Sequence, residues 1–395
     1  MPEPVTVVGI GADGWDGLSP AAQSAVLAAD VLMGSTRQLA LVPGDGFERV
    51  AWPSPLSEAL PRLLSEYQGR QVCVLASGDP TFHGIGTTLA RLLGADAVRV
   101  IPHPSSVSLA CARLGWPQDQ VQVISLVNQP VERLHPHLQP GRRLLILSRD
   151  AQTPAQVAGL LAERGYASST YTVLEQLGGP TERIRSELSG DVDALNVIAV
   201  RCQADAGAPL LSTVPGLPDD AYESDGQLTK REVRAVTLSR LAPVPGQLLW
   251  DVGGGAGSIA IEWSRHHPTC RAIAIERDPD RAKRLERNAV SLGASVAVVL
   301  GKAPDALNGL ETPDAIFIGG GATAAGMVEA CWKALAPGGR LVLNGVTLET
   351  ETLIARWYGD LGGDLIRLDV QRASAVGTMT GWRPAMPVTI WSVTK

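Results

Sequence analysis

Two glycine-rich loops constrain the fold of this chain more than any other feature. One begins at Gly9 and the other at Gly253, and each directly follows a short apolar run typical of a β-strand. Glycine in such a turn lets the backbone approach a ligand closely, and a helix behind the turn offers free N–H groups. The loops follow different sequence templates and no internal repeat is evident. We therefore expect two ligand-binding domains with different folds.

The chain is long enough for two domains of ordinary size, with 395 residues. Residues 203–226 are rich in Pro, Gly, Asp and Ser and show no helical or strand period, as is typical of an interdomain linker. The sequence therefore predicts an N-terminal domain over residues 1–204, a linker over 205–226 and a C-terminal domain over 227–395.

Short β-branched runs alternate with helix-like stretches, such as 20–29 and 154–164, on both sides of the linker. This alternation predicts an α/β protein with parallel sheets and crossover helices in both halves. Residues 364–371 and 387–393 lie close together in the sequence with no helical pattern between them. We expect these two runs to form an antiparallel strand pair at the edge of the last sheet.

Composition excludes several classes of protein. A net charge of −6 argues against a dedicated nucleic-acid binder, because nothing global attracts phosphate. No signal-like segment and no apolar run of membrane-spanning length occurs, so no membrane association is expected. The five cysteines have no metal-ligand spacing and suggest reduced core thiols in a cytoplasmic protein, with no bound metal. They are Cys73, Cys111, Cys202, Cys270 and Cys331.

The second glycine loop, DVGGGAG, places Asp251 and three alternate glycines between an apolar strand and a helix. A nicotinamide fingerprint would need glycine where Ser258 stands. The D-x-G-x-G-x-G spacing resembles that of class I S-adenosylmethionine-dependent methyltransferases. In that class an acidic residue at the end of the next strand, here Glu276, accepts the ribose hydroxyl protons. The alternative is a similar turn that holds another ligand or none.

The resemblance to class I methyltransferases implies further cofactor contacts. The adenine amino group would be met near Lys302, which cannot accept a hydrogen bond, so backbone at Lys302 and Ala303 would replace a side chain. Glycines at 319, 320 and 321 stand where enzymes that methylate amino nitrogens carry a [DN]PP[YF] motif, which argues against base methylation. The implied cofactor residues are Asp251, Gly253, Gly255, Gly257, Glu276, Lys302, Ala303, Gly319 and Gly320.

The first loop matches the dinucleotide pattern GxGxxG only as text. In a dinucleotide-binding fold the helix starts at the third glycine, which here is Gly14. We instead expect the helix to start at Ser19 as N-cap, with Pro20 in its first turn. The spacing therefore disfavours a dinucleotide site.

The remainder of the N-terminal half resembles the tetrapyrrole methylases over residues 5–202. This family has a second, unrelated S-adenosylmethionine-binding fold with two α/β lobes. The segments that carry the resemblance are ADVLMGSTRQL (29–39), LASGDPTFHGIG (75–86), PSSVSLACARLGWP (104–117), LGGPTERI (177–184) and NVIAV (196–200).

The resemblance implies a first cofactor site built from two turns. The tight turn at Gly78-Asp79-Pro80 would present backbone to the methionine moiety, and a helix N-terminus at Ser105 and Ser106 would bind its carboxylate. A role for His83 in the same turn stays open. Relatives often carry Ser-Leu-His-Gly-Arg where residues 125–129 read Ser-Leu-Val-Asn-Gln. The implied cofactor residues are Gly9, Gly11, Gly78, Asp79, Ser105 and Ser106.

A fusion of these two folds resembles the bifunctional decarboxylating methyltransferases of the corrin branch of cobalamin biosynthesis. The resemblance implies S-adenosylmethionine as cofactor and a precorrin-6-type tetrapyrrole as substrate. The N-terminal domain would methylate meso carbon C5, and the C-terminal domain would methylate C15 and decarboxylate a ring acetate. Both component families commonly assemble, so a homo-oligomer, either a dimer or a tetramer, is expected.

The substrate carries several carboxylates, which Arg and Lys side chains bind well. The candidates are basic residues of the segment 228–241 and of the C-terminal strands, with Glu349 at a position where the family also carries Glu. A solvated surface charge is the alternative for each basic residue, and the run 277–287 is better explained as an exposed helix face. The candidate catalytic residues are Lys230, Arg234, Glu349 and Arg372, and Arg231 and Arg383 are further candidates for carboxylate binding.

Two other functions compete with this interpretation. A methyltransferase acting on RNA or on another small molecule, with an accessory domain, would fit the class I loop. It would also predict a basic face and a base-flipping motif, which the sequence lacks. A non-catalytic S-adenosylmethionine sensor would predict a damaged glycine loop, whereas both loops are intact.

Overall fold

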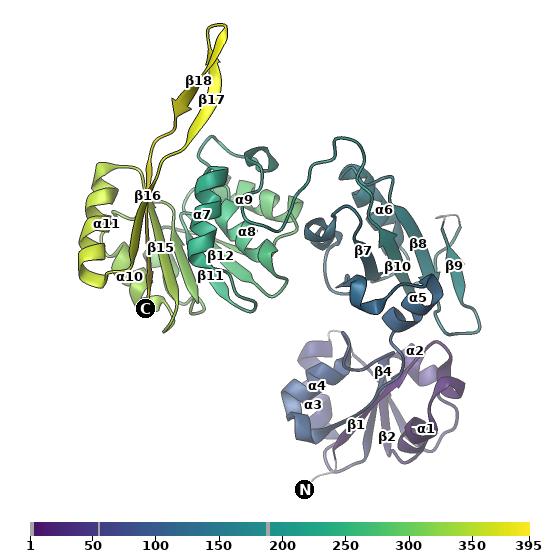
Figure 1. Ribbon diagram of the computed structural model, residues 1–395. Coiled ribbons are helices and arrows are strands. Elements are labelled where there is room, and N and C mark those ends of the chain that lie inside the picture. The colour runs from purple at the N-terminus through teal and green to yellow at the C-terminus, as the bar shows by residue number, and fades with distance from the viewer. Residues whose placement is uncertain (1–3, 54–55, 187–189) are drawn as a thin grey trace. The chain divides into compact units, whose positions relative to one another are not determined.

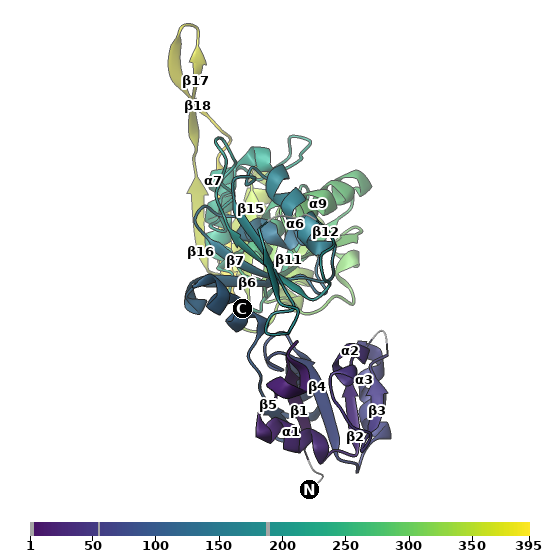
Figure 2. The ribbon, with the colours of Figure 1, turned by 90° about the vertical axis from the view of Figure 1, so that its right-hand side faces the viewer.

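The computed structural model describes residues 4–53, 56–186 and 190–395, and it separates into two compact units (Figures 1 and 2). Unit 1 comprises Met1–Val131 and Pro140–Pro209. Unit 2 comprises Glu132–Gln139 and Leu210–Lys395.

The first lobe of unit 1 is a parallel five-stranded sheet in the order β3-β2-β4-β1-β5. Its first helix starts where the sequence predicts, since the Ser19 hydroxyl accepts the Ala22 N–H and Pro20 occupies the first turn. Its strands are β1 (Val5–Ile10), β2 (Val31–Gly34), β3 (Glu48–Ala51), β4 (Val72–Ser77) and β5 (Val98–Ile101). Its helices are η1 (Gly14–Gly17), α1 (Pro20–Leu27), α2 (Thr36–Ala40), α3 (Leu56–Glu66), α4 (Ile85–Leu93) and η2 (Ala95–Ala97).

The second lobe corrects the expectation of parallel sheets throughout. Its sheet, in the order β6-β7-β10-β8-β9, is parallel only between β6 and β7. An alternation of short strands and helical stretches in the sequence does not reveal that a strand runs antiparallel to its neighbours, as β10 does. The strands are β6 (Val121–Ser125), β7 (Arg143–Leu147), β8 (Thr170–Glu175), β9 (Arg183–Arg185) and β10 (Asn196–Arg201). Helices α5 (Ser106–Leu114) and α6 (Thr153–Glu163) accompany them, with η3 (Gln118–Gln120).

Unit 2 is built on a seven-stranded sheet in the order β13-β12-β11-β14-β15-β19-β16. The first five strands are parallel, and β19 runs antiparallel to both of its neighbours, which confirms the predicted antiparallel pair. The strands are β11 (Leu248–Val252), β12 (Arg271–Glu276), β13 (Val296–Leu300), β14 (Ala315–Ile318), β15 (Arg340–Gly345), β16 (Asp364–Leu368) and β19 (Val388–Thr394). The helices are η4 (Val131–His137), η5 (Asp219–Ala221), α7 (Arg231–Leu241), α8 (Ser258–His266), α9 (Pro279–Ser291), η6 (Asp305–Leu307), α10 (Met327–Ala334) and α11 (Leu348–Leu361).

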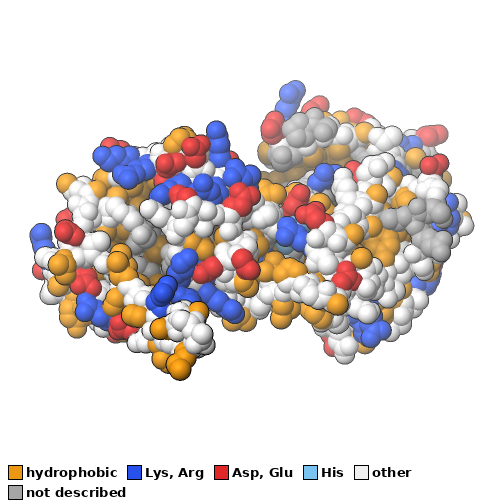
Figure 3. Space-filling view, turned by 90° about the horizontal axis from the view of Figure 1, so that it is seen from above, with side chains coloured by type: hydrophobic (Ala, Val, Ile, Leu, Met, Phe, Trp, Pro, Cys, Tyr) orange, Lys and Arg blue, Asp and Glu red, His pale blue; other side chains and the backbone are white. Residues whose placement is uncertain are grey.

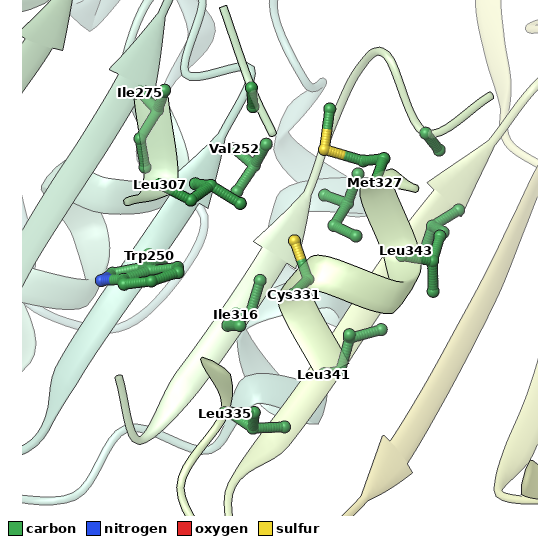
Figure 4. Packing of buried hydrophobic residues seen from close by; sticks show 14 of the residues in the cluster. Trp250, Val252, Ile275, Leu307, Ile316, Met327, Cys331, Leu335, Leu341 and Leu343 are labelled. Carbon is green, nitrogen blue, oxygen red and sulfur yellow. The ribbon is translucent and has the colours of Figure 1, made fainter. Parts of the chain in front are cut away.

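Helices cover both faces of this sheet. Helices α7, α8 and α9 pack on one face and α10 and α11 on the other. Trp250 of β11 is buried beside Ile316 of β14, and Cys331 of α10 faces them (Figure 4). A central strand with both faces covered must be apolar throughout, which explains the run Leu-Leu-Trp before Asp251. This packing fixes the strand ends that carry the glycine loop.

A hairpin of strands β17 (Gln371–Val376) and β18 (Met379–Pro384) interrupts the antiparallel pair and projects beyond the sheet of unit 2 (Figures 1 and 2). The sequence pattern does not predict this hairpin, because most of its side chains are small or polar and show no strand-like alternation. Met379 and Trp382 on this hairpin are largely exposed. In the space-filling view Lys and Arg side chains gather beside its base and hydrophobic ones at its tip (Figure 3).

Most of the segment with linker composition, from Leu210 onward, is part of unit 2. Leu217 and Tyr222 are buried, and both contact the carboxylate of Glu262 by donating a hydrogen bond to it. A polar, glycine-rich composition indicates that a segment lacks regular secondary structure. It does not indicate whether other residues bury that segment. No helix among the described residues is both long and apolar enough to cross a membrane.

Candidate functional site

Unit 2 contains a cavity of about 740 Å³ at the carboxyl ends of its parallel strands. Ligands of open α/β sheets bind at this edge. The segment before α7 and residues next to the hairpin complete the wall. The lining residues include Asp251, Gly253, Gly255, Glu276, Lys302, Ala303, Gly319 and Gly320, eight of the nine cofactor residues predicted for this half.

The three alternate glycines of the loop have different structural roles. Gly253, Gly255 and Gly257 all have positive φ, of 80°, 57° and 82°, a backbone region that other residues adopt only with strain. A Cβ on Gly255 would meet nothing closer than 3.8 Å, so this position is open to the cavity. A Cβ on Gly257 would lie 2.5 Å from Leu285, which makes this glycine a packing requirement of helix α8. Gly257 does not line the cavity, contrary to the cofactor contact expected for it.

Two buried carboxylates hold the loop. Glu276 accepts the N–H of Gly255 at 2.8 Å and that of Asp278 at 2.9 Å, one on each oxygen. Asp251 accepts the N–H of Ala260 in the first turn of α8 at 3.1 Å. Burial raises the pKa of Asp251 to about 7, while the Ala260 hydrogen bond lowers it and the charge of Glu276 raises it. The end of β12 and the start of α8 are thereby tied to the glycine loop.

The four candidate catalytic residues are not brought together. Lys230 and Arg372 line the cavity, and each has an acidic neighbour: Lys230 Nζ lies 3.9 Å from Asp219, and Arg372 donates a hydrogen bond to Glu232. Glu349 is exposed in the first turn of α11 and does not line the cavity.

Arg234 is buried and faces away from the cavity, which corrects its assignment as a substrate ligand. Its guanidinium donates to Glu262 and to the carbonyl oxygens of Thr229 and Leu217, and it lies 3.2 Å from Asp219. Lys230 is the N-cap of α7 and borders the cavity, whereas Arg234, in the first turn of the helix, is covered by the segment before α7 and by α8. Arg234 therefore holds the segment before α7 in place and has no free donor directed at a ligand.

Unit 1 contains a cleft of about 430 Å³, lined by residues of both of its lobes. Five of the six predicted cofactor residues line it, namely Gly11, Gly78, Asp79, Ser105 and Ser106. His83, which has a positive φ of 55°, lines it as well. The resemblance to the tetrapyrrole methylases therefore predicted residues that the fold brings to one cleft.

Gly9 does not line this cleft, and its position is required by packing. A Cβ there would lie 2.2 Å from the carbonyl oxygen of Gly78 and 2.7 Å from the backbone nitrogen of His103. Glycine at position 9 therefore allows the turn at Gly78 to pack against β1. The turn itself is closed by Asp79, which accepts the N–H and the hydroxyl of Thr81 at 2.8 and 2.7 Å. The first glycine loop therefore supports the turn at Gly78-Asp79-Pro80.

Helix α5 begins as predicted, with Ser105 as its N-cap. The Ser105 hydroxyl accepts the N–H of Ser108 at 3.0 Å. The helix ends at Gly115, which has a left-handed conformation. The first N–H groups of α5 therefore lie at the cleft beside the turn at Gly78.

Several cleft residues were not singled out from the sequence. Arg37, Gln38 and Trp52 come from the region after β2, and Ser148 and Asn196 form a 2.6 Å hydrogen bond on the second lobe. Arg37 and Gln38 belong to the segment ADVLMGSTRQL. The resemblance of this segment to the family was the one signal in the sequence that could have identified them as cleft residues.

The fold and its two cavities define a fusion of two methyltransferase folds, a two-lobed tetrapyrrole-methylase fold followed by a class I fold. The model of the Tetrapyrrole (Corrin/Porphyrin) Methylases matches residues 4–193, and that of the Precorrin methyltransferase domain matches residues 220–395. A precorrin-6Y C(5,15)-methyltransferase (decarboxylating) of Sinorhizobium sp is 47% identical, covering 99% of this chain and 96% of that protein. The chain belongs to the precorrin-6Y C(5,15)-methyltransferase (decarboxylating) family.

Two shorter relatives are each named for one methylation activity alone. A cobalt-precorrin-7 C(5)-methyltransferase of Salmonella typhimurium is 34% identical over 46% of this chain and 88% of its own. A probable cobalt-precorrin-6B C(15)-methyltransferase (decarboxylating) of Saccharolobus solfataricus is 35% identical over 35% of this chain and 72% of its own.

Proposed function

We propose that this chain uses S-adenosylmethionine to methylate a precorrin-6 macrocycle at two meso carbons in cobalamin biosynthesis. Unit 1 methylates C5, and unit 2 methylates C15 and releases CO2 from a ring acetate. The observation that carries the proposal is that each unit has its own cavity beside its own glycine-containing turn. Family membership over the full length, and relatives named for each activity alone, support two separable activities in this chain.

The cavity of unit 2 fits the proposed cofactor. Gly255 leaves space where any side chain would project into the cavity, and the Glu276 carboxylate lies at its wall. A carboxylate has about four acceptor positions, and Glu276 accepts two backbone hydrogen bonds, so it keeps capacity for ribose hydroxyls. Lys302 and Ala303 lie at the end of β13, where backbone contacts to an adenine base are expected.

The cleft of unit 1 fits the same cofactor in a different way. Gly78 has φ of 59°, and its turn exposes backbone next to the start of α5. The N–H groups at Ser105 and Ser106 suit the carboxylate of a methionine moiety, because a helix N-terminus attracts anions. Both turns lie on the cleft wall, so backbone polar groups would do most of the binding.

The rim of the cavity in unit 2 suits an acidic macrocycle with apolar faces. Val346 and Met386 line the cavity although 48% and 67% of each is exposed, and Lys230 and Arg372 lie on the same lining. Apolar side chains can pack against the ring while the two cations bind its carboxylates. Arg277 also lines this cavity. The sequence had indicated that the run 277–287 is an exposed helix face, but its first residue borders the proposed ligand site.

The chemistry requires alignment more than a strong base. When bound, S-adenosylmethionine supplies an electrophilic methyl group. Conjugated meso carbons are nucleophilic, so holding the two partners in line can supply roughly 7–11 kcal/mol of the barrier. Loss of CO2 leaves an electron pair that the macrocycle delocalises, and the residues around the rim would orient the acetate for it.

We further propose a homo-oligomer, a dimer or a tetramer, in the cytoplasm. All five cysteines are free and buried, as expected in a reducing compartment. Burial raises the pKa of Cys73 and of Cys331 to about 12. These thiols are therefore inert packing residues, as the sequence predicted.

Calorimetric titration of the full chain with S-adenosylhomocysteine tests the two-site proposal. The wild type should show two sites per chain, and Gly255→Arg should lose one. The matched control is Gly338→Arg, because Gly338 also has positive φ and an open surrounding, with no atom within 4 Å of an added Cβ, but does not line the cavity. A single site in the wild type contradicts the proposal.

The division of labour is tested with a precorrin-6-type substrate and mass spectrometry of the product. The wild type should add two methyl groups and release CO2. Gly255→Arg should abolish CO2 release. Continued CO2 release by that variant would place decarboxylation in unit 1 and overturn the assignment.

A further inference from the structure

The cleft of unit 1 has one strongly basic side chain. Among the described residues that line it, Arg37 is the sole Arg or Lys, and most of the others are apolar or glycine. A precorrin carries several carboxylates, and S-adenosylmethionine carries one. The position of this guanidinium therefore bears on how either molecule is held.

Arg37 is fixed next to the turn at Gly78 by its neighbours. Ser77, the residue before that turn, accepts hydrogen bonds from Nη2 of Arg37 and Nε2 of Gln38, both at 3.0 Å. Gln38 is itself held by a capping box, since its Oε1 accepts the N–H of Ser35 at 2.7 Å and its own N–H donates to the Ser35 hydroxyl. The guanidinium thus has a defined place at the cleft wall.

Asp79 and Asp193 each accept hydrogen bonds within their own turns, although the charge of Asp193 also acts on Arg37. Asp79 accepts both hydrogen bonds from Thr81, and Asp193 accepts the N–H of Leu195 at 2.8 Å. No carboxylate of the described residues lies within 4.0 Å of the Arg37 guanidinium. Burial lowers the pKa of Arg37, and the charge of Asp193 partly opposes this.

A guanidinium has five N–H donors, and the structure gives this one a single hydrogen bond, to a neutral hydroxyl. The side chain is exposed, so its other donors are open to water and to a ligand in the cleft. These properties describe a cation that is positioned for an incoming anion.

We propose that Arg37 binds a carboxylate of the ligand in the cleft of unit 1. The inference rests on the proposed function, because it takes the tetrapyrrole or its methyl donor as that ligand. A planar guanidinium can bind a carboxylate with two parallel hydrogen bonds. The carboxylate belongs either to an acid side chain of the macrocycle or to the methionine end of the cofactor.

The test uses full-length Arg37→Gln and Arg37→Lys. Arg62→Gln is the matched control, because Arg62 is exposed on α3 and does not line the cleft. Transfer of a ¹³C-labelled methyl group to C5 is followed by NMR, which separates it from transfer to C15. S-adenosylhomocysteine binding to each variant is measured by calorimetry, and thermal unfolding shows that each variant is folded.

If the carboxylate belongs to the macrocycle, Arg37→Gln should lower kcat/KM for C5 methylation roughly 10- to 100-fold, the usual loss for a charge-assisted pair. Cofactor affinity would be unchanged. Esterifying the substrate's acids should shrink the difference between Arg37→Gln and wild type to less than about twofold. If the carboxylate belongs to the cofactor, one S-adenosylhomocysteine site should weaken by a similar factor instead.

Arg37→Lys should recover part of the loss in either case, because it keeps the charge without the planar fork. The inference is overturned if folded Arg37→Gln matches Arg62→Gln in both C5 methylation and cofactor affinity. A wild-type chain that methylates no precorrin contradicts the proposed function instead. In that event the calorimetric comparison still decides whether Arg37 binds the cofactor carboxylate, and unchanged affinity overturns the inference.

Discussion

Nε of Arg234 lies 2.5 Å from Oε1 of Glu262, and both side chains are buried in unit 2. The same carboxylate accepts the N–H groups of Gly216 and Leu217 and the hydroxyl of Tyr222. This pair therefore attaches the segment before α7, which also lines the cavity, to helix α8.

Arg234→Met should destabilise unit 2 by about 3–5 kcal/mol, because it leaves the Glu262 carboxylate buried without its cation. Urea unfolding measures the loss. Lys230→Met removes a charge from the adjacent turn, but the Lys230 side chain is half exposed. The free energy of unfolding of this variant should therefore differ from that of the wild type by less than about 0.5 kcal/mol. If Arg234→Met kept wild-type stability and lost only tetrapyrrole binding, the ligand role expected from the sequence would be restored.

Gly9→Ala should damage the cofactor site of unit 1 without touching the cleft. Its Cβ would press on backbone atoms of Gly78 and His103, an overpacking that costs about 1–3 kcal/mol. We expect a lower unfolding temperature for unit 1 and weaker S-adenosylhomocysteine binding at one site, with the other site unchanged. Gly46→Ala is the control, because a Cβ there meets nothing within 4 Å. Equal behaviour of the two variants would contradict this role of Gly9.

The stability of unit 2 should depend on pH through Asp251, whose pKa burial raises from 3.8 to about 7. Between these values the folded chain keeps a proton that the unfolded chain has released. The free energy of unfolding therefore falls as pH rises from about 4 to 7, by roughly 4 kcal/mol at most from this residue. Above pH 7 its contribution is constant.

Asp251→Asn isolates this contribution, because an amide oxygen can still accept the Ala260 N–H but does not titrate. Urea unfolding at pH 5 and pH 8 should show a smaller fall for the variant than for the wild type. An identical fall in both proteins would show that Asp251 is ionised in the folded state at pH 5.

Arg372 and Arg383 are directly paired across the β17–β18 hairpin, yet only Arg372 lines the cavity. Arg372→Gln should raise KM for the tetrapyrrole in the C15 reaction roughly tenfold, since a charge-assisted hydrogen bond would be lost. Arg383→Gln should change KM less than about twofold. Steady-state kinetics of CO2 release compares them, and equal effects would mean that net charge rather than position matters.

Features set by neighbouring residues were predictable. Ser19 caps its helix as expected, a helix begins at Ser105 and Ser106 as expected, and the loop from Asp251 to Ser258 joins a strand to a helix. Glu276 ends the next strand, as its position after an apolar run indicated. Caps, turns and glycine loops are short-range arrangements, so their residues carry enough information to identify them.

Features set by distant residues were not predictable. Arg37 and Ser77 are 40 positions apart and meet only because β2 and β4 are adjacent strands. The hairpin and the antiparallel pairs in the sheet of the second lobe depend on pairing partners that sequence patterns do not specify. Leu217 is likewise buried by helix α8, which begins some 40 residues later in the sequence.

The sequence by itself determined that two different methyltransferase folds are joined and which turns border their cavities, because those motifs are local and their spacing is characteristic. Only the tertiary structure decided which charges face a ligand. Lys230 caps α7 and Arg234 follows it by four residues, but Lys230 borders the cavity and Arg234 is buried with Glu262. Whether a side chain is covered depends on the elements that pack against it, and those are distant in the sequence.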